Sequence, residues 1–243
     1  MSVGKKPGRI MSVVTTLGSE IARGERSPGS FIAPEHELAL RFGVGRGVIR
    51  EAMKTLAGKG LVSVAPREGT KVLPRSNWVL MDRDILSWMR REGTFDAELL
   101  SALEEFRSIF EPESAALAAT RADEGDRLKI STSFDEMAAA TTDEEAVAAD
   151  IRFHLAILDA TRNPVLQSFR GTIEALLSAL FVETVGAFKE NLANHGTVAD
   201  AIAKGDGQAA RMAMRNVLAT TREHIQQGKE TLPVVERTTS VGG

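Results

Sequence analysis

The chain has 243 residues, of which 43% are hydrophobic and 26% charged, the balance of an ordinary globular protein with one large or two modest domains. It contains no cysteine, which excludes disulfides and any thiolate metal ligand or nucleophile. No apolar run approaches the roughly 20 residues that span a membrane, and polar residues interrupt the basic start, so we expect no membrane segment, no secretory signal and a cytoplasmic location.

The net charge of −3 conceals a division along the chain. Residues 1–75 hold 13 Lys and Arg against 6 Asp and Glu, whereas residues 76–243 hold 17 against 27. Chance clustering of surface charge is one explanation. The other is that the first part binds a polyanion such as DNA and the second part does not.

The first part has the pattern of a small DNA-binding domain. Three segments have the apolar spacing of helices and end near glycines: 10–22, 34–43 and 46–57. Two β-type runs follow, at 61–65 and 70–73, on either side of the turn residues 66–69. Three helices and a hairpin predict a winged helix-turn-helix over residues 8–74.

The remainder is predicted to be helical. Residues 75–81 have the composition of a linker, and residues 82–229 have helical spacing in six or seven segments. The expected breaks lie near 93–94, 123–125, 141–143, 163–164, 186 and 205–207. The tail, 230–243, has little apolar surface to bury and is expected to be disordered. The fold class is therefore mainly α, a winged helix-turn-helix followed by a helical bundle.

Arg46 and Arg50 are the first candidates for reading DNA bases. They lie one helical turn apart at the start of the third expected helix, so their side chains point the same way. Arginine matches the O6 and N7 atoms of guanine, and its planar fork also clamps phosphates. A recognition helix carries such donors near its N-terminus, and the alternative is a solvated helix face.

Five further residues extend this candidate DNA-binding surface. Arg41 ends the second expected helix, where it could reach the DNA backbone. Arg67 and Lys71 flank Gly69 in the hairpin, and a glycine there lets the tip approach the minor groove closely. His36 lies in the first turn of the second helix, and an ordinary surface position is the alternative for it, for Arg41 and for Lys71.

This segment resembles the GntR family of bacterial regulators. The residues that match the family's pattern, with its spacing, are Pro34-Glu35, Leu38-Ala39, Phe42-Gly43-Val44, Arg46 and Arg50-Glu51-Ala52. Gly45 and Gly47 replace the usual Ser or Thr neighbours of Arg46, which removes a hydroxyl contact to phosphate, although Gly45 still suits an N-cap. The resemblance implies a transcription regulator and places His36 where relatives often carry a base-contacting basic residue. Because symmetric regulators read symmetric sites, we expect a homodimer on a double-stranded DNA operator.

Four polar residues of the helical part lie on apolar stripes. Arg107 faces the interior, where its charge requires an anion, either a ligand carboxylate or an internal acid such as Asp150. Asp150 and His154 are four residues apart on one helix face, and His195 shares a face with apolar residues of another helix. A single buried histidine is more often an ordinary core residue, but the three together suggest ligands for a metal or an effector.

The helical part, over most of 82–226, resembles the FCD effector domain of the FadR-type branch of the GntR family. The matching residues include Glu104, Arg107, Glu111-Pro112, Asp150, Phe153-His154 and Gly205-Asp206. The resemblance implies a zinc or nickel ion held by one Asp and three His. Asp150, His154 and His195 match three of these positions, but the fourth falls at Val217. His224 is two turns further on, roughly 10 Å away, so we expect metal to be bound weakly or not at all.

The junction between the two parts, residues 75–88, resembles that of regulators of sugar-acid catabolism. Together with the polar cluster it predicts a repressor that an aldonate or uronate releases from its operator, with Arg107 and the cluster binding this carboxylate. Another organic acid or an acyl group is the alternative effector. A metal-dependent hydrolase built on the same cluster is the alternative function, but no nucleophile or general base accompanies it, so we expect no enzyme.

Overall fold

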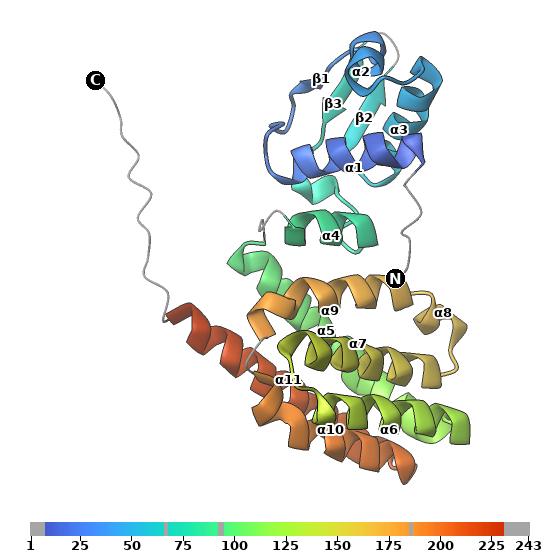
Figure 1. Cartoon of the computed structure of the whole chain (residues 1–243), viewed down its shortest axis with the longest axis vertical. Helices are drawn as coiled ribbons and strands as arrows, with labels where there is room; N and C mark the ends of the chain where they lie inside the picture. Colours follow the sequence, from blue (N-terminus) through green and yellow to red (C-terminus); the bar gives the residue numbers. More distant parts are fainter. Residues whose placement is uncertain (1–7, 66–67, 92–94, 185–186, 231–243) are drawn as a thin grey trace. The chain divides into compact units, whose positions relative to one another are not determined.

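The computed structural model describes residues 8–65, 68–91, 95–184 and 187–230 (Figure 1). Arg67, the expected break near 93–94 and residues 231–243 of the expected tail lie outside the described residues, whereas Glu230 still belongs to the last helix. The chain divides into two compact units, Met1–Ala97 and Glu98–Gly243. In the described part of the chain, no helix has both the length and the apolar character required to cross a membrane.

The first unit is a winged helix-turn-helix, as predicted. Its elements are α1 (Arg9–Ala22), β1 (Phe31–Ile32), α2 (Glu35–Phe42), α3 (Arg46–Gly58), β2 (Val62–Ala65), β3 (Gly69–Val72), a 3-10 turn (Arg75–Asn77) and α4 (Arg83–Arg91). The strands form an antiparallel sheet in the order β1-β3-β2, with β2 and β3 as the expected hairpin. The strand β1 was not predicted, since two residues are too few to show a pattern. The helix α2 begins at Glu35, with Pro34 as its N-cap, one residue later than the expected segment 34–43.

The core of this unit lies between α1, α3 and the sheet. Its side chains, all at most 2% exposed, include Val13, Val14, Leu17, Ile49, Leu56, Leu61, Val62 and Val72. These residues fall at the helical and alternating spacings that the sequence shows, so the apolar pattern accounts for the packing. The opposite faces of α2 and α3 remain exposed and carry the basic residues.

The helix α4 packs on α1 within the first unit, although the helical spacing of the sequence predicts a second domain from residue 82 onward. Gly18 makes this packing possible, because a Cβ there would lie 2.4 Å from the Trp88 ring. Lys59, at the C-terminus of α3, also binds Asp82 and Asp84 near the start of α4, with both distances 2.8 Å. The apolar face of α4 is therefore buried within the first unit.

The second unit is a helical bundle. Its elements are α5 (Ala97–Arg121), α6 (Glu124–Ala139), α7 (Asp143–Ala160), α8 (Pro164–Gln167), α9 (Arg170–Thr184), α10 (Ala187–Ala203) and α11 (Gly207–Glu230). All but one of the expected breaks inside the unit fall between described helices; the break near 186 lies outside the described residues. Asp123 and Thr142 form capping boxes at the starts of α6 and α7, which explains why those two helices begin there. An additional break, at Ser168-Phe169, separates the single turn α8 from α9.

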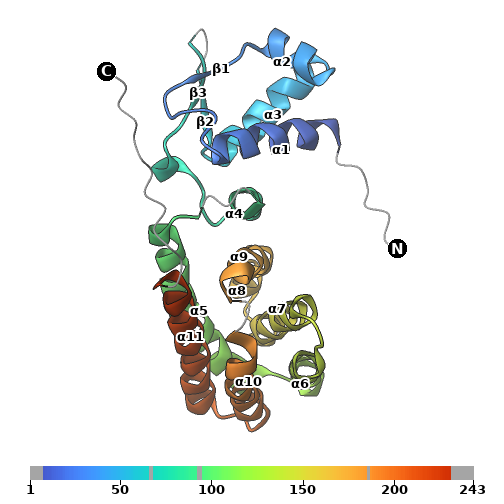
Figure 2. The same cartoon turned by 60° about the vertical axis from the view of Figure 1, so that its left-hand side comes forward.

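The helices of the second unit pack mainly as pairs. The helices α6 and α7 form one pair and α10 and α11 another (Figure 1). Figure 2 shows α11 running beside α5, and the ion pairs Glu113–Arg211 and Glu104–Arg222 fix these two helices as antiparallel. The apolar core of the bundle includes Phe153, Ile157, Val198, Ile202 and Met214. The polar residues singled out in the sequence lie at the edge of this core.

Candidate functional site

The first candidate site is the exposed N-terminal part of α3. Gly45 caps the helix with an extended backbone, φ −72° and ψ 152°, so Arg46 begins the first turn. Arg46 and Arg50 are both exposed, to one side of the buried stripe that includes Ile49. Arg46 makes no ion pair within the part of the chain that the structure describes. Arg50 has Nε and Nη2 each 3.4 Å from the carboxylate of Glu35, in a solvent-exposed pair.

Arg41 is held by an acid on another helix, which no pattern in the sequence indicates. Its guanidinium donates to Glu20 of α1, a side chain only 7% exposed, and its Cζ lies 4.9 Å from the centre of the Phe42 ring. Arg26 donates to the same carboxylate from Nε, at 2.8 Å. Burial raises the pKa of Glu20, but the two guanidinium groups outweigh this effect and lower the pKa below its usual value. Arg41 is therefore a fixed cation, and 45% of its side chain remains exposed.

The wing carries the other predicted DNA contacts. Gly69, the first residue of β3, has φ +95°, a conformation that favours glycine. Lys71 is paired in the sheet with Phe31, and its Nζ lies 4.9 Å from the centre of that exposed ring. His36 is exposed on α2, with Nε2 3.9 Å from the Glu37 carboxylate. These positions stay predictions for DNA contact.

The second candidate site is a polar cluster inside the bundle, and the structure brings its predicted members together. Asp150 and His154 lie on α7 and His195 lies on α10. Asp150 Oδ1 is 3.5 Å from His154 Nε2 and 3.0 Å from His195 Nε2, and the possible ligand atoms all lie within 4.8 Å of one another. Both histidine side chains are 2% exposed. We call these three residues the Asp/His cluster.

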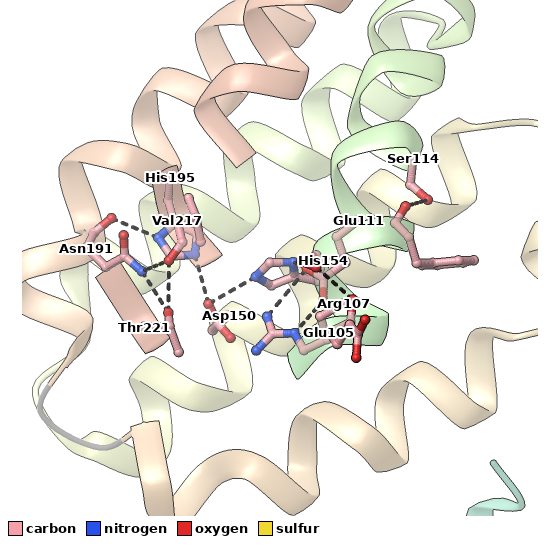
Figure 3. Close-up of polar contacts among 12 residues, drawn as sticks. Glu105, Arg107, Glu111, Ser114, Asp150, His154, Asn191, His195, Val217 and Thr221 are labelled. Carbon is pink, nitrogen blue, oxygen red and sulfur yellow. Dashed lines mark hydrogen bonds and ion pairs between the residues drawn. The ribbon is translucent and has the colours of Figure 1, made fainter. Parts of the chain in front are cut away.

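Arg107 is buried as predicted, but its anion comes from the protein. Its Nε donates to Glu111 Oε1 at 2.5 Å and its Nη2 to Oε2 at 3.4 Å, so the internal acid is Glu111 rather than the expected Asp150. The physical reason is proximity, since Glu111 lies one turn further along α5, on the same face as Arg107. Glu111 Oε2 is also 2.6 Å from His154 Nδ1. Figure 3 shows Arg107 and Glu111 of α5, His154 and Asp150 of α7, and His195 of α10 as one continuous series of polar side chains.

Charges alternate along this series. Burial raises the pKa of Glu111, but Arg107 and then His154 outweigh it and bring that pKa down to about 2. Burial lowers the pKa of His154, but Glu111 and Asp150 outweigh it and raise that pKa to about 9. The pKa of Asp150 is likewise lowered by the histidines, against the effect of burial. The cluster without a metal is thus a buried series of ions that stabilise one another.

The histidine nitrogens test whether a metal would fit. His195 Nδ1 lies 2.9 Å from the carbonyl oxygen of Asn191, which only accepts, so Nδ1 carries a proton and Nε2 is the nitrogen that a metal could bind. This Nε2 lies 3.0 Å from Asp150 Oδ1, so one bound cation could be shared by both atoms. His195 Nε2 and His154 Nε2 are buried and make no hydrogen bond. Two ligands bound tetrahedrally about 2.1 Å from a zinc ion lie ~3.4 Å apart. The distances from Asp150 Oδ1 to the Nε2 atoms of His154 and His195, 3.5 and 3.0 Å, are close to this value.

The fourth metal position implied by the resemblance is filled by a core residue. Val217 lies on α11, is 1% exposed, and is seen beside His195 in Figure 3. Its carbonyl oxygen accepts from Asn191 Nδ2 at 2.8 Å, so α10 and α11 are held together here by backbone and amide groups. The Asp/His cluster therefore offers three protein donors, and a fourth would have to come from an effector or water.

Comparisons with known proteins agree with the two units. The description "Bacterial regulatory proteins, gntR family" matches residues 10–72, and the FCD domain matches residues 102–220. The galactonate operon transcriptional repressor of Escherichia coli strain K12 is 36% identical over 220 residues, covering 88% of this chain and 96% of the repressor. The Uxu operon transcriptional regulator of the same organism is 30% identical, covering 82% of this chain and 79% of that one.

A solved structure of Lar, which controls expression of the Listeria monocytogenes agr system and mediates virulence, has a similar fold. It matches with a TM-score of 0.64 at 22% identity, covering 92% of this chain and 99% of that chain. At this level of identity the likeness concerns the arrangement of helices and strands alone.

Proposed function

The chain belongs to the GntR family of bacterial regulatory proteins and carries an FCD effector domain, and from this premise we propose a homodimeric repressor that a sugar acid releases from its operator. The DNA-binding and regulatory role follows from the family. The repressor role, the dimer, the effector and the site residues are the proposal. The name of the galactonate repressor and the buried Asp/His cluster support it.

The chemistry of the cluster carries the effector assignment. Buried polar atoms without hydrogen bonds are rare in folded proteins, and His154 and His195 provide them beside Asp150. Hydroxyl groups both donate and accept, so an aldonate or uronate can bind the carboxylate oxygen and the imidazole nitrogens together. An acyl chain would leave these groups unsatisfied. Arg107 is already neutralised by Glu111, so we place it beside the site, where it orients Glu111 and His154.

A divalent zinc or nickel ion would be held by Asp150 Oδ1, His154 Nε2 and His195 Nε2. Bound there, such an ion would act as a Lewis acid toward the carboxylate and hydroxyl oxygens of the effector. Glu111 and the Asn191 carbonyl would orient the two imidazole rings from their Nδ1 atoms, the usual arrangement behind metal-bound histidines. With Val217 at the fourth position, we propose weak and reversible metal binding.

Regulation requires that the effector bind the two functional states differently. If the effector binds more tightly to the state with low operator affinity, it lowers the affinity for the operator. The largest possible reduction is the ratio of the effector's affinities for the two states. Each half of a symmetric operator would contact one recognition helix of the homodimer, with Arg46 and Arg50 facing base edges and Arg41 and Lys71 facing phosphates. His36 and Gly69 would complete this surface.

The test of the proposed function begins with an operator selected from random duplexes by repeated binding to the full chain. Galactonate, gluconate and galacturonate are then added in turn. A true effector at a hundredfold excess over its Kd stabilises the protein by ~2.7 kcal/mol, so we expect the melting temperature to rise by roughly 5–10 °C. The same compound should release the labelled operator in an anisotropy titration.

The matched variants are Asp150→Asn and Asp135→Asn. The first removes the carboxylate charge of the Asp/His cluster, and the second removes an exposed carboxylate charge on α6. We expect Asp150→Asn to lose both responses while still binding the operator, and Asp135→Asn to retain them. Stabilisation by decanoate or by amino acids, with no response to any sugar acid, would remove the effector assignment and leave the regulator intact.

The metal prediction concerns Val217. The variant Val217→His is expected to raise zinc or nickel affinity at least tenfold, because it adds a third imidazole as the fourth protein ligand of a closed site. Leu218→His is the control, since it buries an imidazole at the next position, about 100° around α11. Isothermal titration with each metal measures the change. Stoichiometric metal that resists chelators in the unaltered chain would contradict the prediction of weak binding.

A further inference from the structure

A buried carboxylate in the DNA-binding unit joins two arginines. Glu20, on α1, accepts hydrogen bonds from Arg26 in the following loop and from Arg41 in the last turn of α2. The three side chains differ in exposure: 7% for Glu20, 22% for Arg26 and 45% for Arg41. We call them the Glu20 triad.

We propose that Glu20 is a positioning residue that holds Arg41 for contact with a DNA phosphate. This inference rests on the proposed DNA-binding surface and assigns a role to a residue outside it. The Glu20 carboxylate holds the guanidinium of Arg41 through two nitrogens, and the Phe42 ring lies against its carbon. An arginine fixed in this way loses less side-chain entropy when it binds a phosphate.

The charges of the triad explain why an acid can assist a contact with an anion. Glu20 carries one negative charge, and Arg26 and Arg41 carry two positive charges, so the triad has a net charge of one positive. The more shielded Arg26 compensates Glu20, and the more exposed Arg41 presents the remaining charge to solvent. Arg41 lies at the C-terminal end of α2, across the Gly43–Gly45 turn from Arg46. The first helix of a helix-turn-helix crosses the DNA backbone, which is the partner that this position fits.

Two other readings make different predictions. In the first, the triad only ties the loop to α1 and α2, and then loss of Glu20 lowers stability without changing DNA contacts. In the second, Glu20 simply opposes the phosphates, and then its loss tightens DNA binding. The dependence of affinity on salt separates these readings, because its slope counts the phosphates that the protein neutralises.

The experiment uses the full chain and a labelled duplex of random sequence, since a phosphate contact does not depend on sequence. Anisotropy titrations over a series of NaCl concentrations give the slope of log K against log salt. Arg41→Ala is expected to reduce the magnitude of the slope by about 0.9, the value for one phosphate. Glu20→Gln is expected to reduce both slope and affinity toward those of Arg41→Ala, and the double variant should show no further loss.

Two more variants complete the test. Glu25→Gln removes the same charge from the same region, where Glu25 pairs with Arg23 at the surface, and should leave the slope unchanged. Glu20→Asp keeps the charge but withdraws the carboxylate from Arg41, so it should reduce the slope if Glu20 positions Arg41 and leave it unchanged in both other readings. If Glu20→Gln folds poorly, this charge-conserving variant decides the question.

An unchanged slope in Glu20→Gln and Glu20→Asp, or tighter binding by Glu20→Gln, would overturn the proposal. These outcomes differ from a failure of the proposed function, in which the unaltered chain itself shows no salt-dependent binding to DNA.

Discussion

Replacement of Arg46 by alanine is expected to weaken binding to the selected operator by about 5- to 150-fold, which corresponds to ~1–3 kcal/mol. The side chain is exposed in the first turn of α3 and makes no ion pair within the described part of the chain, so its whole donor set is available to a base edge. For the same reason the melting temperature should not change. Anisotropy titrations against the operator and against a random duplex measure the effect.

The two titrations together distinguish base reading from phosphate binding. Arg46→Ala should reduce the preference for the operator, whereas Lys71→Ala should weaken both duplexes equally. Lys54→Ala is the control on the same helix, since Lys54 is exposed beyond the N-terminal turn and pairs with Glu51. Unchanged operator affinity in Arg46→Ala would show that another face of the unit reads the DNA. Arg50→Ala is expected to have a smaller effect, because Arg50 must first leave Glu35.

The helices of this fold could be predicted from the sequence wherever punctuation residues separate them. Asp123 and Thr142 indicate the starts of α6 and α7 through their capping boxes. Asn163 and Pro164 indicate the start of α8 as its N-cap and first residue. The break at Ser168-Phe169 could not be predicted, because neither residue is a helix breaker. The sequence also does not predict to which unit α4 belongs. The apolar stripe of α4 shows that this helix packs against another element, but it does not show which one. The complementary feature, the missing side chain of Gly18, lies far away in the sequence.

The candidate sites were predictable to different degrees. Helical spacing places Asp150 beside His154, and the structure adds His195 from another helix, as expected. The spacing of Arg107 and Glu111 is visible in the sequence, but it does not reveal that Glu111 faces inward rather than solvent. Pairs between separate elements, such as Glu20 with Arg41, leave no periodic trace. Such contacts depend on how the helices pack, which local patterns do not determine.

Replacement of Arg107 by alanine is expected to lower the free energy of unfolding by about 3–5 kcal/mol, the range for breaking a buried ion pair. Arg107 and Glu111 are 5% and 6% exposed, and Arg107 is the cation that keeps the Glu111 carboxylate charged beside His154. Urea denaturation followed by circular dichroism measures the change. The control is Arg152→Ala, which breaks an exposed pair with Glu136 and should cost less than 1 kcal/mol, in line with ~0–1 for such pairs.

The double variant Arg107→Met, Glu111→Leu tests whether the loss comes from the stranded carboxylate or from the missing arginine. Removal of both charges leaves His154 paired with Asp150, so no buried charge lacks a partner, and we expect the double variant to recover most of the stability. If it were no more stable than Arg107→Ala, the packing of the arginine stem would be the larger contribution. A loss below 1 kcal/mol in Arg107→Ala would contradict the buried pair itself. Because the single variant removes a structural charge, its loss of effector response would not identify Arg107 as an effector ligand, and Asp150→Asn remains the direct test of that site.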